Sequence, residues 1–137
     1  MKNINLNNVI ELLEAAVDKK GREYVDPDAL SHTRCSYAKD GAPSCIVGHV
    51  LVDLGVPVEE LTDSGLGEVS ELFNDNDPYY VEIVSRVTAT GPALEVLSKA
   101  QAVQDQQGTW GDALDSARRL QERRLQHIHN TPGVVDE

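Results

Sequence analysis

Apolar residues recur at helical spacing in four segments of this chain, and this periodicity limits the fold more than any other feature. The clearest segment runs from Leu6 to Val17, and the second runs from Ile46 to Leu54. Two later segments, Leu94–Val103 and Ala113–Leu125, keep the same period. Such spacing places apolar side chains on one face of an α-helix. The sequence therefore predicts a mainly α fold of about five helices that pack through these faces.

Residues with known capping preferences flank the periodic segments. Asn8 with Glu11 forms a predicted capping pair at the start of the first helix, and Gly21 ends it. Ser44 is the predicted N-cap of the second helix, and the Thr109–Asp112 pair begins the last one. These positions predict where the helices begin and end.

Two stretches lack a helical period or carry mixed signals. Arg22–Pro43 contains turn dipeptides, which predict a loop or a small β-hairpin, with Glu23–Val25 and Cys35–Tyr37 as its short strands. Residues 78–90 are rich in strand formers, but Asp77–Pro78 is typical of a helix start. We therefore predict a helix there.

The length of 137 residues suits one compact domain, which we place at residues 1–129, with a flexible tail at 130–137. Aromatic residues make up only 4% of the chain, so the expected core is aliphatic. Trp110, the single tryptophan, is the predicted core anchor at the start of the last helix. Since no apolar run has the length of a membrane span or resembles a secretion signal, we expect a cytoplasmic protein without membrane contact.

Both cysteines and two of the four histidines lie within eighteen residues, as His32, Cys35, Cys45 and His49. Thiolate and imidazole groups at such spacing are ligands for tetrahedral Zn²⁺. Cys45 and His49 are one helical turn apart and therefore neighbours on one face. The cluster is a candidate structural zinc site, and no other cofactor is expected.

Three other interpretations of the cluster stay open. The cysteines and His49 can be ordinary core residues, because free cysteine is among the most buried residue types. In an exported protein, Cys35 and Cys45 could instead form a disulfide. Cys45 could also be a nucleophile at a helix N-terminus with His49 as its base. No motif supplies an orienting group or an oxyanion hole, so the sequence favours a protein that is not an enzyme.

Negative charge is concentrated in the middle of the chain. The net charge is −11, and residues 40–85, which we call the acidic segment, contain ten acids and no Lys or Arg. The predicted partner-binding residues are Asp53, Glu59, Glu60, Asp63, Glu68 and Glu71. A solvated face that aids solubility is the simplest interpretation. The alternative is a face that docks on a basic partner or imitates the charge of nucleic acid, because the field of such a face steers association.

Positive charge gathers near the end of the chain. The predicted basic stripe consists of Arg118, Arg119, Arg123 and Arg124. It is expected to pair with acidic residues, within the molecule or across a homodimer. A weak contact with nucleic acid is the alternative, although the overall negative charge argues against one.

Two short motifs resemble a family of small uncharacterised proteins of actinobacteria and their phages. They are the run at 43–56, a Cys-bearing helix that ends in Leu-Gly, and Thr109–Leu114. The stretch Gln104–Trp110 departs slightly in register from the family pattern. The resemblance implies a phage or actinobacterial accessory protein and implies no activity.

Together these features predict a small acidic accessory protein that binds a host or phage protein with a basic surface through residues 40–85. The alternatives are a zinc-stabilised domain, a cysteine-dependent enzyme that uses Cys45 and His49, and a nucleic-acid contact through the basic stripe.

Overall fold

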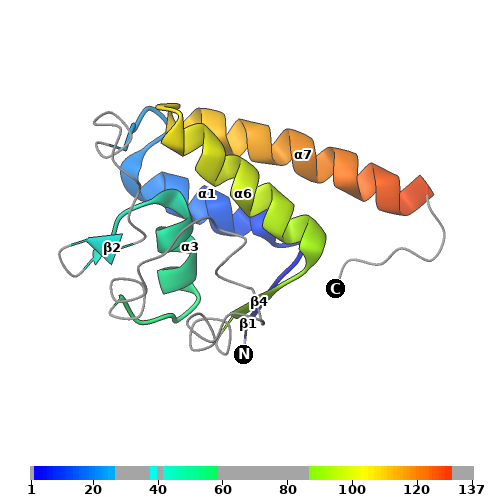
Figure 1. Ribbon diagram of the computed structural model, residues 1–137, viewed down its shortest axis with the longest axis horizontal. Coiled ribbons are helices and arrows are strands. Elements are labelled where there is room, and N and C mark those ends of the chain that lie inside the picture. Colours follow the sequence, from blue (N-terminus) through cyan, green and yellow to red (C-terminus); the bar gives the residue numbers. More distant parts are fainter. Residues whose placement is uncertain (1, 27–37, 40–41, 59–86, 131–137) are drawn as a thin grey trace.

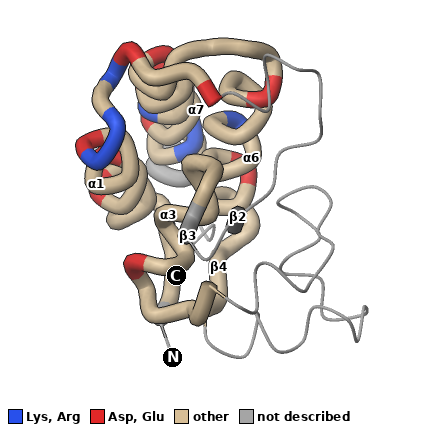
Figure 2. Tube along the Cα trace, turned by 90° about the vertical axis from the view of Figure 1, so that its left-hand side faces the viewer, with Lys and Arg blue, Asp and Glu red and all other residues tan. Residues whose placement is uncertain are grey.

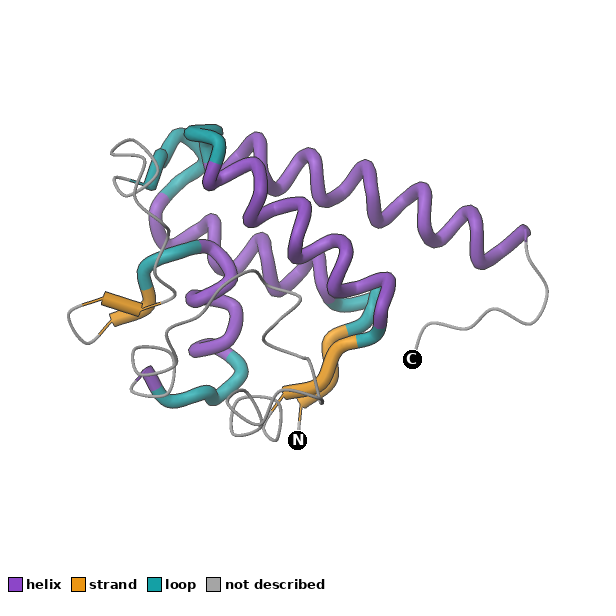
Figure 3. Tube along the Cα trace, viewed as in Figure 1, coloured by secondary structure: helices purple, strands orange, loops and turns teal. Residues whose placement is uncertain are grey.

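The computed structural model describes residues 2–26, 38–39, 42–58 and 87–130. Within these residues it is mainly helical, with four helices and two small two-stranded sheets (Figures 1 and 3). The predicted mainly α class is confirmed, whereas the described residues hold four helices instead of about five. Most of the helix predicted at 78–90 lies outside them.

Helix α1 (Val9–Lys20) follows the sequence prediction closely. Its predicted apolar face is buried, and its C-cap is Gly21, whose φ of 96° lies in the region that favours glycine. The predicted capping pair is wrong in detail, because the Asn8 side chain caps no helical N–H. Its Oδ1 accepts the backbone N–H of Asn5 at 2.8 Å, and its Nδ2 donates to the carbonyl of Asn3.

Helix α3 (Ile46–Asp53) begins one residue later than predicted. Its N-cap is Cys45 instead of Ser44, and the Cys45 Sγ accepts the backbone N–H of Gly48 at 3.3 Å. A second cap comes from another helix: the Ile46 N–H donates to Oε1 of the buried Gln104 at 2.8 Å. A helix leaves its first N–H groups without partners inside the helix, so these two acceptors satisfy a buried helix start.

Helices α6 (Gly91–Asp105) and α7 (Trp110–Asn130) lie side by side along one edge of the molecule (Figure 1). Thr90 is the N-cap of α6. The start predicted for α7 is confirmed, since Thr109 Oγ1 accepts the N–H of Asp112 at 3.0 Å. The far end of α7 extends past its neighbours, which explains why Leu125, predicted to face inward, is 36% exposed.

The buried face of α6 differs from the predicted one. Leu97 and Ala100 are buried as expected, but Leu94 and Val103 are only half-buried. Ala93 and Val96 are buried in their place. Helix α6 contacts α7, α3 and α1, so its buried surface is set by three neighbouring helices and not by one apolar stripe.

Two short sheets complete the described fold. Strand β1 (Lys2–Ile4) pairs in parallel with β4 (Val87–Ala89), with Ile4 opposite Ala89. The helix predicted over residues 78–90 is therefore wrong at 87–89, because the buried Val87 and its neighbours pair with the N-terminal strand. Strands β2 (Ala38–Lys39) and β3 (Ala42–Pro43) form an antiparallel hairpin.

That hairpin confirms the expected small hairpin between the first two helices, but its strands lie elsewhere than predicted. Tyr24 and its neighbours form no strand, and Cys35–Tyr37 lies outside the described residues.

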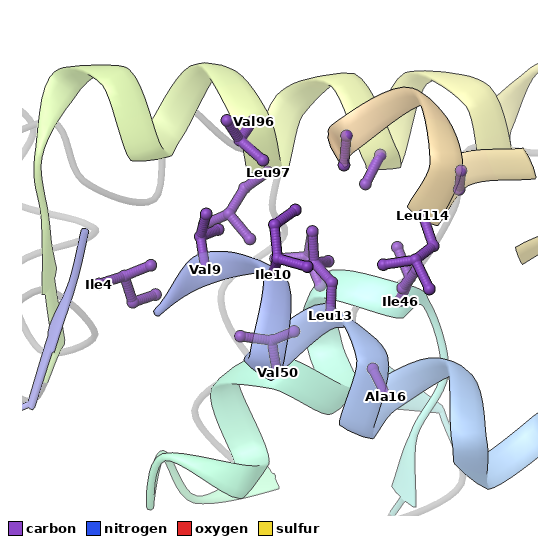
Figure 4. Close-up of a cluster of buried hydrophobic side chains, with 14 of the residues drawn as sticks. Ile4, Val9, Ile10, Leu13, Ala16, Ile46, Val50, Val96, Leu97 and Leu114 are labelled. Carbon is purple, nitrogen blue, oxygen red and sulfur yellow. The ribbon is translucent and has the colours of Figure 1, made fainter. Parts of the chain in front are cut away.

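The core lies where α1, α3, α6 and α7 meet. Aliphatic side chains from all four helices, together with Ile4 of β1, converge there (Figure 4). Trp110, at the first position of α7, is fully buried, which confirms it as a core residue. Most of the other buried hydrophobic residues are aliphatic, as the scarcity of aromatic residues predicts.

Candidate functional site

Two of the four predicted zinc ligands lie in the described part of the chain, and both are buried. Cys45 is a free thiol with no exposed surface, and its sulfur is the N-cap acceptor of α3. His49 follows one turn later and is 6% exposed. His32 and Cys35 lie outside the described residues. The candidate site is therefore centred on Cys45 and His49.

The His49 ring packs against the indole of Trp110 in an edge-to-face contact. The ring centroids are 5.5 Å apart and the planes meet at 73°. This geometry suits two aromatic rings, because the positive edge of one meets the negative face of the other. Among the residues that the structure describes, neither ring nitrogen of His49 has a hydrogen-bond partner. His49 therefore acts as an aromatic core residue that carries two unsatisfied polar atoms.

The environment of His49 disfavours a positive charge. Burial lowers the pKa of His49 below 6.5, and the positive charges of Lys19 and Lys20 at the end of α1 lower it further. Asp53 acts in the opposite direction, but its carboxylate also forms an ion pair with Lys19. The imidazole is consequently neutral at physiological pH.

Trp110 connects His49 to the loop after α1. Its indole also meets the ring of Tyr24 edge to face, with centroids 5.0 Å apart and planes at 84°. The first two N–H groups of α7 bind this loop as well: Trp110 donates to the Tyr24 carbonyl at 2.9 Å, and Gly111 donates to the Arg22 carbonyl at 2.7 Å. The loop thus supplies backbone acceptors for a helix start whose N–H groups have none within the helix.

The same contact explains why a glycine follows the tryptophan. A Cβ at position 111 would lie 2.8 Å from the Arg22 carbonyl oxygen and 2.9 Å from the Arg22 Cβ. We expect Gly111→Ala to lower the free energy of unfolding by about 1–3 kcal/mol, because the loop must move away from the start of α7. Urea unfolding followed by circular dichroism measures this loss.

Gly91→Ala is the matched control, since a Cβ at position 91, also in the first turn of a helix, meets nothing within 4 Å. Equal stability of the Gly111 and Gly91 variants would contradict the close approach of Arg22.

The observed surroundings of Cys45 do not fit a nucleophile. Its sulfur has no exposed surface and accepts a backbone N–H, so a substrate could reach it only if α3 separated from its neighbours. Within residues 2–26, 38–39, 42–58 and 87–130, no group of three or more His, Cys, Asp or Glu side chains is placed to hold a metal ion. The zinc prediction thus depends on His32 and Cys35, and it stays a prediction.

Of the six predicted partner-binding acids, only Asp53 lies in the described part of the chain. It forms an ion pair with Lys19, which joins α3 to α1. Asp53 therefore has a structural partner inside the molecule. The other five residues, from Glu59 to Glu71, lie outside the described residues.

The predicted basic stripe divides into two pairs of arginines. Arg118 forms an ion pair with Glu14 of α1, and Arg124 forms one with Glu95 of α6. Arg119 and Arg123 are exposed, and Arg119 donates to Ser116 Oγ at 3.1 Å. The described charges lie mainly on α1, α6 and α7, whereas α3 carries almost none (Figure 2). Two of the four arginines of the stripe thus form surface ion pairs that link α7 to α1 and α6.

Sequence reasoning missed two residues that organise this region. Gln104 is fully buried and caps α3 from α6, and Tyr24 packs on Trp110. The only sequence signal for Gln104 was its own position, as a polar residue on the apolar side of a helix. The partner of that residue, the Ile46 N–H, is 58 positions away in the chain.

None of the described helices is long and apolar enough to cross a membrane. Comparison with protein-family models, with curated proteins and with solved structures finds no match to this chain.

Proposed function

We propose that this chain is a non-enzymatic accessory protein that binds a basic surface of a partner protein through the acidic segment. The proposal rests on the placement of charge along the chain. The acidic segment holds ten acids without a single Lys or Arg, in a chain whose net charge is −11. A concentrated charge of one sign attracts and orients a partner of the opposite sign.

The ion pairs of the helices support the proposal, because nearly all of them use acids outside the acidic segment. Four basic side chains form ion pairs within the described residues. Their carboxylate partners are Glu14, Asp53, Glu95 and Asp115. Only Asp53 belongs to the acidic segment, so these four pairs neutralise at most one of its ten acids. The helical body thus uses its own acids as counterions, which supports an excess of negative charge in the segment.

The environment of Cys45 supports a binding role over the cysteine-dependent alternative, because its thiol is buried and serves as a helix cap. The ion pairs of Arg118 and Arg124 likewise weaken the nucleic-acid alternative, since they partly neutralise two of the four arginines of the stripe. The resemblance to actinobacterial and phage proteins indicates the source of the partner, a protein of a bacterial host or of its phage.

The test compares two variants that each remove five negative charges. The segment variant carries Glu59→Gln, Glu60→Gln, Asp63→Asn, Glu68→Gln and Glu71→Gln. The body variant carries Glu11→Gln, Asp18→Asn, Glu23→Gln, Asp112→Asn and Glu122→Gln, all at exposed positions. Asp53 is kept in both variants, because its ion pair with Lys19 contributes to the fold.

Each protein is immobilised and used to capture partners from an actinobacterial lysate at about 50 mM and about 300 mM salt. We expect the wild type and the body variant to capture the same protein at low salt, and the segment variant to lose it. For the purified partner, the association rate should fall at least tenfold in the segment variant. Equal capture by the two variants would contradict the role of the acidic segment.

A further inference from the structure

The sheet of β1 and β4 has two strands, so no other described strand pairs with the outer edge of β1 (Figure 3). The Ile4 carbonyl points toward β4, because it accepts the N–H of Thr90 at 3.0 Å. Successive carbonyls of a strand point to opposite edges, and the N–H of each peptide group points opposite to its carbonyl. The Asn3 carbonyl and the Asn5 N–H therefore lie on the outer edge of β1. Such an edge is a template for another strand.

The Asn8 side chain closes this edge with two hydrogen bonds. Its Nδ2 donates to the Asn3 carbonyl at 2.9 Å, and its Oδ1 accepts the Asn5 N–H at 2.8 Å. In a parallel sheet, one residue of the neighbouring strand donates to the carbonyl of residue i and accepts the N–H of residue i+2. Asn3 and Asn5 stand in this relation. The amide of Asn8 thus makes the two bonds that one residue of a third parallel strand would make.

Asn8 is able to serve the edge because Asn5 caps the start of α1 in its place. The Asn5 Oδ1 accepts the backbone N–H groups of Asn7 and Asn8 at 2.9 and 3.1 Å. The Asn3 side chain bonds within the sheet, where its Oδ1 accepts the hydroxyl of Thr88 at 2.8 Å. Each of these asparagine side chains therefore has its own partners, and those of Asn8 lie on the outer edge of β1.

The sequence of β1 carries little other protection against strand pairing. Charged residues and proline are common on protected edge strands. Lys2 is the only charged residue of β1, and the strand has no proline. Asn3 is exposed, so the edge lies at the surface. The net charge of −11 makes two copies of the chain repel each other, but salt screens this repulsion.

We propose that Asn8 prevents β1 from pairing with an extended strand of a second copy of this chain, because its side-chain amide takes the place of a third strand. Removal of the amide leaves one carbonyl and one N–H on the edge for the backbone of the second copy. This inference is independent of the proposed function, because it involves no residue of the acidic segment.

The test compares substitutions at position 8 that leave different groups at the edge. Asn8→Ala removes both hydrogen bonds. Asn8→Ser, whose side chain is too short to bridge Asn3 and Asn5, is a second variant in case alanine perturbs the start of α1. Asn8→Asp also loses the donor to Asn3, but it places a negative charge at the edge, which opposes strand pairing. Asn7→Ala is the control, because Asn7 is an exposed neighbour of the same residue type.

Sedimentation velocity is measured from about 10 µM to about 1 mM protein, in about 0.5 M salt to screen the repulsion between copies. We expect the wild type, Asn7→Ala and Asn8→Asp to keep the mass of a monomer. Asn8→Ala and Asn8→Ser should approach the mass of a dimer or larger as the concentration rises. The proposal is overturned if both stay monomeric or if the wild type associates to the same extent. Equal association of Asn8→Asp would also overturn it, since a weakened start of α1 would then be the cause.

Hydrogen exchange followed by NMR tests the closed edge directly. In Asn8→Ala, we expect the Asn5 N–H to exchange about three- to tenfold faster than in the wild type, the range that corresponds to the loss of one hydrogen bond. The amides of α7 should keep their rates, and Asn7→Ala should leave the Asn5 rate unchanged. An unchanged Asn5 rate in Asn8→Ala would overturn the proposal, because the Asn8 amide would then not occupy the edge.

Discussion

Trp110→Ala is expected to lower the free energy of unfolding by about 3–5 kcal/mol, the largest loss that we anticipate from one substitution in this chain. The indole is fully buried and contacts the rings of both Tyr24 and His49. Alanine would leave a cavity between α3, α7 and the loop after α1. Both the lost contacts and the cavity destabilise the folded state.

Thermal unfolding followed by far-ultraviolet circular dichroism is the suitable measurement, because this variant has no tryptophan fluorescence. The melting temperature should fall by roughly 10 °C or more. Trp110→Phe is the control: it keeps an aromatic ring for Tyr24 and His49 and should lose less than half as much stability. If both variants melted like the wild type, Trp110 could not be a core residue.

Leu97→Ala should cost about 2–5 kcal/mol, because Leu97 is fully buried where α6 meets its neighbouring helices. Leu94→Ala provides a matched comparison, with the same residue type on the same helix about one turn earlier. Leu94 is only half-buried, so its truncation returns less apolar area to water and should cost less than half as much.

The comparison distinguishes the observed face of α6 from the one that periodicity predicts. Urea unfolding of the two variants measures the difference directly. Similar losses for both would indicate that α6 is rotated to bury Leu94 and Leu97 equally, as the sequence pattern implies.

The sequence predicted elements best where the deciding interactions are local. The face of α1 follows from its apolar spacing alone, and Gly21 ends it because the chain there adopts a positive φ. The Thr109–Asp112 cap of α7 is likewise a contact between residues three apart. Such features require no knowledge of the rest of the fold.

The sequence predictions were wrong where a contact with residues distant in the chain decides the local structure. Residues 87–89 are a strand because Lys2–Ile4 lies beside them, and no pattern near position 87 reveals that pairing. Leu94 was expected inside because its spacing fits one stripe, but α6 is packed on more than one side. Arg118 and Arg124 form ion pairs with different helices because α7 runs beside both α1 and α6.

The candidate site likewise combines features that depend on local sequence with features that depend on distant contacts. The sequence by itself determined that Cys45 and His49 lie one turn apart on an apolar helix, that Trp110 begins another helix, and that negative charge gathers in residues 40–85. Each of these follows from residue type and from spacing along the chain. Only the tertiary structure decided that His49 packs on Trp110, that Gln104 caps α3, and that the Arg22 carbonyl occupies the space beside Gly111. These contacts join residues dozens of positions apart, and local periodicity carries no information about which helices become neighbours.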